Sequence, residues 1–148
     1  MPKVTRDEER ITRVSQALVS SGLDALVCTL PSNVLMLSGY WPVIGSAIAI
    51  ATREGYIAVV APEDEQDPAL GGWADSVRTF SPAPLNKLTS VAQAVCGPLS
   101  DLNRALRLRA GAKIGFEGEP SFDPAGYAST FIYGAAIQEL LQTSFASN

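Results

Sequence analysis

Carboxylates are the only reactive side chains that this sequence groups closely enough to suggest chemistry. An acidic run extends from Glu63 to Asp67, and Glu117 and Glu119 flank a glycine after a predicted strand. Such oxygen ligands suit a hard cation such as Mg²⁺ or Ca²⁺. The run lacks the alternation and the glycine of a calcium loop, so we interpret it as solvated charge at the start of a helix. Glu117 and Glu119 have no partner base or metal cluster and define no reaction by themselves.

The sequence contains no histidine. A Ser-His-Asp triad, a Cys-His pair and a histidine metal ligand are therefore all excluded. Histidine is also the only side chain whose unperturbed pKa lies near neutral pH, so acid–base catalysis would need a strongly shifted carboxylate, lysine or tyrosine. Most common hydrolytic mechanisms are excluded, and we predict no catalytic residue and no metal ligand in this chain.

Composition indicates one folded domain. The chain has 148 residues, of which 47% are hydrophobic and 18% charged, which is typical of a globular domain with a single core. Its 11 basic and 15 acidic residues give a net charge of −4, and a nucleic-acid surface would need a basic stripe instead. Cys28 and Cys96 are too few for a disulfide framework, and Cys28 lies in an apolar run where a thiol acts as a small hydrophobe.

No targeting or membrane segment is evident. The N-terminus is charged and lacks the apolar core of a signal peptide. No apolar stretch approaches the roughly 20 residues that span a bilayer. We therefore expect a cytoplasmic protein that has neither a membrane nor a nucleic acid as a partner.

An aromatic pair lies in the predicted loop from Ser38 to Gly45. Tyr40 and Trp41 are flanked by Gly39 and Gly45, and Pro42 favours an extended backbone for the residue before it. Aromatic residues in rigid loops often make contacts, because they carry much area with few rotatable bonds. They can equally cover the edge of a sheet, and the sequence alone leaves both interpretations open.

Strands and helices alternate along the chain, and these elements must position the carboxylates and the aromatic pair. A capping box from Thr5 to Glu8 begins an amphipathic helix that ends at Gly22. A turn with Gly55 joins two apolar strands into an antiparallel hairpin. The result is a three-layer α/β/α domain around a mixed sheet of about five or six strands. The predicted strands are 23–29, 46–51, 56–61, 76–80 and 112–117. Further helices are predicted to begin at residues 30, 84 and 99, and another, capped by Asp123-Pro124, extends across Tyr127 to Tyr133. The Gly97-Pro98 pair separates two of these helices, and segment 135–145 is ambiguous and allows a strand.

Several segments, in the same order, resemble the N-terminal domain of the creatinase, prolidase and Xaa-Pro aminopeptidase family. They are Ser21-Gly22-Leu23-Asp24-Ala25-Leu26-Val27, Pro31-Ser32-Asn33-Val34-Leu35-Met36-Leu37-Ser38-Gly39-Tyr40, Arg53-Glu54-Gly55 with the later Ala61-Pro62-Glu63-Asp64-Glu65, and Lys113-Ile114-Gly115-Phe116-Glu117. Met36 stands where the family usually has an aromatic residue. The resemblance extends from about Arg10 to Phe145 and implies the ribonuclease H-like motif of that domain.

The resemblance implies a two-domain enzyme. In this family a C-terminal catalytic domain binds two divalent metal ions (Mn, Co or Zn) and cleaves bonds next to proline, while some relatives hydrolyse creatine. That domain is absent here, so we expect residues 1–148 to form a single N-terminal domain without a cofactor of its own. Its expected partners are its own catalytic domain and a second copy in a homodimer. By position, the resemblance also implies a loop close to the substrate, formed by Asn33, Tyr40, Trp41, Pro42, Val43 and Ile44.

Three hypotheses follow from the sequence. The first is the non-catalytic N-terminal domain of a metal-dependent Xaa-Pro peptidase-like or creatinase-like hydrolase, which assists dimerisation and closes the active site of the catalytic domain. The second is a free-standing α/β binding or scaffold module that uses Tyr40 and Trp41. The third is an autonomous hydrolase that uses Glu117 and Glu119 with a bound cation.

Overall fold

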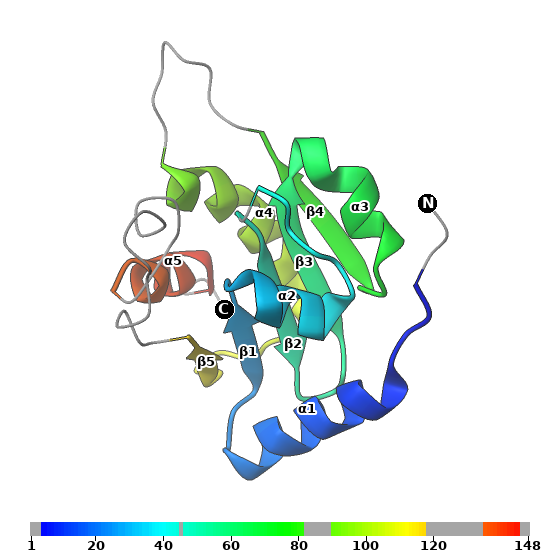
Figure 1. Ribbon diagram of the computed structural model, residues 1–148. Helices are drawn as coiled ribbons and strands as arrows, with labels where there is room; N and C mark the ends of the chain where they lie inside the picture. The colour runs from blue at the N-terminus through cyan, green and yellow to red at the C-terminus, as the bar shows by residue number, and fades with distance from the viewer. Residues whose placement is uncertain (1–3, 45, 82–89, 118–134, 146–148) are drawn as a thin grey trace.

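A five-stranded mixed sheet forms the centre of the computed structural model, which describes residues 4–44, 46–81, 90–117 and 135–145. The strand order is β4-β3-β2-β1-β5 (Figure 1). The strands are β1 (Ala25–Cys28), β2 (Ile48–Thr52), β3 (Ile57–Pro62), β4 (Ser76–Phe80) and β5 (Ile114–Phe116). Strand β2 pairs antiparallel with both β1 and β3. The two outer pairs are parallel, since β5 pairs parallel with β1 and β4 pairs parallel with β3. The predicted hairpin is confirmed, and Gly55 turns it at a φ of 82°.

Helices cover both faces of the sheet. One face carries α1 (Glu8–Ser20), α2 (Pro31–Ser38) and α3 (Gln66–Gly71), which follows the short 3-10 turn η1 (Glu63–Glu65). The other face carries α4 (Val91–Leu106) and α5 (Ala135–Phe145). Side chains of β2 alternate between the two cores, because Ile48 and Ile50 pack toward α4 while Ala49 and Ala51 pack toward α1 and α2. The predicted three-layer α/β/α architecture is confirmed.

The first helix begins later than the capping box predicted. Asp7 is the N-cap residue, and its carboxylate accepts a hydrogen bond from the Arg10 amide at 2.9 Å. Thr5 does not cap the helix. The chain just before it is bound to the end of α3, where the Val4 amide donates to the Gly71 carbonyl at 2.8 Å. The predicted glycine end is confirmed. Gly22 has a φ of 66°, and the Leu23 amide returns to the Leu18 carbonyl at 2.9 Å as in a Schellman motif.

One helix replaces the two that Gly97-Pro98 was predicted to separate. Helix α4 begins after Ser90, which forms a capping box with Gln93, and continues through Pro98. Pro98 removes one hydrogen bond from the helix. The buried stripe around it packs on the sheet and outweighs that loss, and its members are Val95, Leu99, Leu102 and Leu106.

The C-terminal segment is a helix, so the strand interpretation of 135–145 is wrong. Within α5, the residues Leu140, Leu141 and Ser144 are buried at helical spacing. Leu140 and Leu141 join the core that α4 forms with the sheet. The helix predicted across Tyr127 to Tyr133 and the start of the helix predicted at Pro84 lie outside the described residues.

Candidate functional site

The loop that joins α2 to β2 contains most of the residues that the sequence implied lie near a substrate. We call residues 40–44 the Trp41 loop. It leaves α2 at Gly39, whose φ of 70° ends the helix in the left-handed conformation. A Cβ atom at this position would lie 2.5 Å from Cε3 of Trp73. Glycine is therefore required by both the backbone angle and the close approach of the indole.

Side chains of the Trp41 loop divide between the core and the surface. Tyr40 is buried at 1% exposure, whereas Trp41 is 55%, Val43 77% and Ile44 56% exposed. The sequence left open whether the two aromatic rings make contacts or cover the sheet, and the structure separates them. Tyr40 belongs to the core beneath α2, and Trp41 presents its surface to solvent next to two exposed aliphatic side chains.

A buried carboxylate holds the Trp41 loop from inside. Glu65, in η1, is only 4% exposed. It accepts hydrogen bonds from the backbone amides of Val43 at 2.9 Å and Ile44 at 2.6 Å, and from the hydroxyl of Tyr40. The interpretation of the whole run from Glu63 to Asp67 as solvated charge is therefore wrong at Glu65. Nothing in the acidic run distinguished Glu65 from its neighbours, since the donors that bind it come from a loop more than 20 residues away.

Burial fixes the protonation of the Tyr40 phenol. Desolvation raises the pKa of Tyr40, and the adjacent Glu65 carboxylate raises this pKa further. The phenol therefore stays protonated and acts as a donor to Glu65 over the physiological pH range. Tyr40 is thus a structural support of the loop, although the sequence resemblance grouped it with residues that approach a substrate.

Asn33 lies at the opposite end of α2 and binds Glu117. Its side-chain amide donates to one oxygen of the Glu117 carboxylate at 2.5 Å. The other oxygen accepts from the amides of Thr29 at 2.8 Å and Leu30 at 2.9 Å and from the Thr29 hydroxyl. Glu117 thus joins the end of β5 to the start of α2, and both of its oxygens are engaged. Glu119, its proposed partner in a hydrolase, lies outside the described residues.

The thiol of Cys28 is part of the core, in agreement with its predicted structural role. Cys28 is 2% exposed and packs beneath α2. Burial raises the pKa of the Cys28 thiol, and the nearby Glu117 carboxylate adds to this effect. A neutral buried thiol is a poor nucleophile, so Cys28 offers no reactive group.

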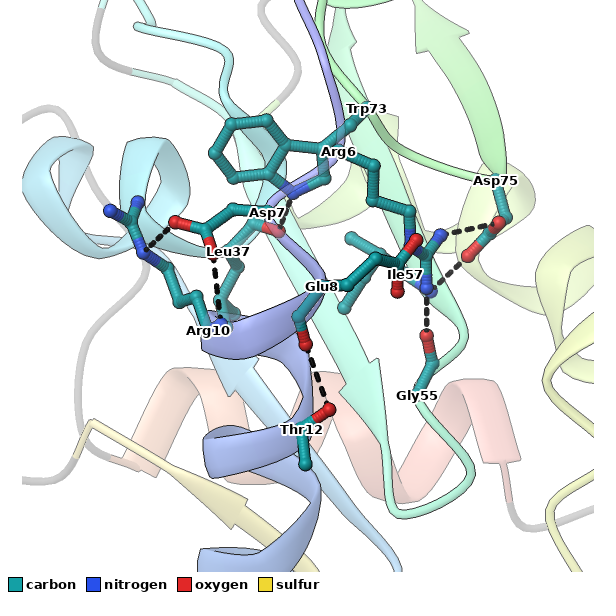
Figure 2. A network of polar contacts seen from close by, with 10 residues as sticks. All are labelled: Arg6, Asp7, Glu8, Arg10, Thr12, Leu37, Gly55, Ile57, Trp73 and Asp75. Atoms are coloured by element: carbon teal, nitrogen blue, oxygen red, sulfur yellow. Dashed lines mark hydrogen bonds and ion pairs between the residues drawn. The ribbon is translucent and has the colours of Figure 1, made fainter.

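Trp73 and the start of α1 fix the end of α2 from which the loop departs (Figure 2). The indole nitrogen of Trp73 donates to the Leu37 carbonyl at 2.7 Å. The Arg10 guanidinium lies over the Trp73 ring, 5.7 Å from its centroid, in cation–π geometry. These contacts keep the ring against Gly39 and limit movement of the α2 end.

The described part of the chain contains no group of three or more Cys, Asp, Glu or His side chains that could hold a metal ion. The buried carboxylate of Glu65 and the partly buried carboxylate of Glu117 are occupied by hydrogen-bond donors of the protein itself. Within the same described ranges, no helix is long and apolar enough to cross a membrane. At the Trp41 loop, the arrangement presents the exposed apolar side chains of Trp41, Val43 and Ile44.

Comparisons with solved structures find this fold in the N-terminal parts of proline peptidases. The chain superposes with a TM-score of 0.60 on a proline dipeptidase from Streptococcus agalactiae, at 15% identity, covering 95% of this chain and 90% of that chain. It matches the creatinase/prolidase N-terminal domain of an X-Pro dipeptidase from Streptococcus pyogenes with a TM-score of 0.59, at 15% identity and 95% and 96% coverage.

A third similar structure is much longer. The prolidase from Pyrococcus horikoshii matches with a TM-score of 0.53 at 21% identity, and the alignment covers 92% of this chain but only 30% of that protein. No protein-family model and no curated protein sequence matches the chain. The chain therefore has the fold of the creatinase/prolidase N-terminal domain, as the sequence resemblance predicted.

Proposed function

We propose that this chain is the non-catalytic N-terminal domain of a metal-dependent Xaa-Pro peptidase-like or creatinase-like hydrolase. In this proposal the Trp41 loop docks on the catalytic domain and closes its active site. The observation that carries the proposal is an apolar loop, exposed at Trp41, Val43 and Ile44, that a buried glutamate holds in place. The fold shared with the N-terminal domain of an X-Pro dipeptidase supports the same assignment.

Energetics support a covered loop. Full burial of a valine or isoleucine side chain is worth about 1.5–3 kcal/mol. Since Trp41, Val43 and Ile44 are each more than half exposed, covering them would contribute roughly 1–2 kcal/mol apiece. Part of that gain offsets the cost of association. A docked loop would also exclude water from the reaction, which is a recognised contribution of closing segments to catalysis.

The partners follow from the same proposal. We infer that the domain works with a catalytic domain that supplies the two divalent metal ions, since the described residues contain no ligand group for them. A homodimer, in which the loop of one copy approaches the site of the other, is part of this proposal. We place the protein in the cytoplasm, and its two cysteines, Cys28 and Cys96, are both free.

Photo-crosslinking tests the proposal. A photoreactive phenylalanine analogue replaces Trp41 in the protein expressed in its native cells, and crosslinked peptides are identified by mass spectrometry. We expect peptides of a metallopeptidase catalytic domain, from the same or a separate chain. The control is the same analogue at Arg104, which is exposed on α4 at the opposite face of the sheet. Crosslinks only to an unrelated protein would favour the free-standing binding module instead.

A second measurement tests the absence of catalysis. We expect the purified chain to leave Xaa-Pro dipeptides intact with or without added Mn²⁺, because Glu117 is fully engaged with Asn33, Thr29 and Leu30. Turnover by protein free of contaminating protease, abolished by Glu117→Gln, would establish the autonomous hydrolase.

A further inference from the structure

Glu65 is a carboxylate in an unusual environment. It is 4% exposed, in a turn that packs against the core under α2. Among the described residues, the ion pairs are formed by arginines with other carboxylates, and none goes to Glu65. An isolated buried charge is costly, so a fold that needed only to fill this space would use an apolar side chain.

Among the residues that the structure describes, the donors to Glu65 come from one short segment. Its two oxygens accept from the amides of Val43 and Ile44 and from the hydroxyl of Tyr40. Hydrogen bonds to a charged acceptor are roughly twice as strong as those between neutral groups. Within the described ranges, the donors that compensate the buried charge therefore belong to the Trp41 loop, and this charge in turn fixes the backbone of the loop at Val43 and Ile44.

The Trp41 loop has the reverse of the usual loop arrangement. The amides of Val43 and Ile44 point inward to Glu65, and the apolar side chains of the same two residues are outside, at 77% and 56% exposure, while Tyr40 and Pro42 are buried. A loop optimised only for solubility would expose polar groups and bury apolar ones. Here the inward polar contacts set which way the exposed apolar side chains face.

We propose that Glu65 is a positioning residue that presets the Trp41 loop for docking. The inference rests on the proposed function, because it takes the catalytic domain as the surface on which the loop docks. A loop already held in its bound conformation does not lose conformational freedom on association, which strengthens binding without any contact from Glu65 itself. Glu65 thus acts through the loop, from beneath it.

Hydrogen exchange measures the positioning directly. In the wild-type chain we expect slow exchange of the Val43 and Ile44 amides. In Glu65→Gln we expect at least tenfold faster exchange at both, because a neutral amide replaces the charged acceptor and brings an N–H group against the loop donors. Amides of Ile57 and Val59 in β3 should keep their wild-type rates. Asp64→Asn, an exposed neighbour in the same turn, is the matched control and should change none of them.

Two outcomes would overturn the proposal. Unchanged exchange at Val43 and Ile44 in Glu65→Gln would mean that the carboxylate does not hold the loop. Equal acceleration in β3 would mean that Glu65 stabilises the whole domain rather than the loop. Tyr40→Phe removes only the hydroxyl donor and is expected to fold if Glu65→Gln does not. It should accelerate the loop amides by a smaller factor, again without an effect in β3.

Crosslinking from position 41 links positioning to docking. We expect the yield with the catalytic domain to fall at least tenfold in Glu65→Gln and to stay at the wild-type level in Asp64→Asn. A full yield in Glu65→Gln would overturn the role of Glu65 in docking. If exchange responds as expected but no crosslink to a catalytic domain forms even without the substitution, the proposed function fails while the hold of Glu65 on the loop stands.

Discussion

Replacing Gly39 by alanine tests whether the Trp41 loop departs from a rigid base. Gly39 and Gly22 both end a helix in the left-handed conformation, at φ values of 70° and 66°. They differ in their surroundings. A Cβ atom at Gly39 would lie 2.5, 2.7 and 3.0 Å from three atoms of the Trp73 ring, whereas a Cβ at Gly22 would meet nothing within 4 Å. Gly22→Ala is therefore a matched control with the same backbone requirement and no neighbour.

The expected magnitude follows from two separate costs. A left-handed conformation costs a residue with a Cβ atom roughly 1–2 kcal/mol. Overpacking a well-packed site adds about 1–3 kcal/mol. Trp73 has little freedom to move aside, because its nitrogen binds the Leu37 carbonyl and Arg10 lies over its ring. We expect Gly39→Ala to lose about 2–5 kcal/mol and Gly22→Ala about 1–2 kcal/mol.

Urea denaturation monitored by circular dichroism gives both free energies of unfolding. Alanine also restricts the unfolded chain, but this effect is the same at both positions and cancels in their difference. The difference between the variants should therefore be about 1–3 kcal/mol and reports the contact with Trp73 alone. Equal losses in the two variants would refute the reasoning, because they would mean that the indole relaxes at no cost.

Three further predictions concern other parts of the fold. Arg107 ends α4 at a φ of 51°, so Arg107→Gly should raise the free energy of unfolding by about 1 kcal/mol in urea titrations, and a loss would contradict this account of the helix end. The pKa of Asp24 is lowered by the hydrogen bond from the Lys113 amide and then by the charges of Arg109 and Arg53. The Asp24 carboxylate therefore stabilises the fold above its unfolded pKa, and this contribution is lost as pH falls below about 4. Denaturation between about pH 6 and pH 3 should show a smaller acid loss in Asp24→Asn than in the wild type. Burial and a raised pKa should keep the Cys28 thiol unreactive toward a thiol reagent until urea unfolds the chain, and rapid labelling of Cys28 in native protein would contradict its placement in the core.

Local signals in the sequence predicted the elements whose cause is local. Gly22 and Gly55 each supply a positive φ where a helix ends or a hairpin turns, and both were identified from their positions alone. The continuous apolar runs of β2 and β3 correspond to strands that are buried at every residue. Fold class followed from these elements and their order.

Errors occurred where distant contacts decide the outcome. Pro98 lies within α4 because the buried stripe of that helix packs on the sheet, which its local helix-breaking tendency does not reveal. Asp7 replaces Thr5 as the cap because the first residues contact Gly71. At the candidate site, sequence reasoning singled out Trp41 but left its exposure open, and it missed Glu65, whose partners are remote in the chain.

Helix α2 is held at both ends by carboxylates that lie outside it. Glu117 accepts from the amides at its start, and Glu65 accepts from the loop at its end. The helix has only eight residues and no side-chain cap of its own, so it is too short to be stable alone. The exposed residues of α2 are therefore not needed to keep it helical. Substitutions at those exposed positions should leave the helix and the Trp41 loop in place, provided that Glu65 and Glu117 are both kept.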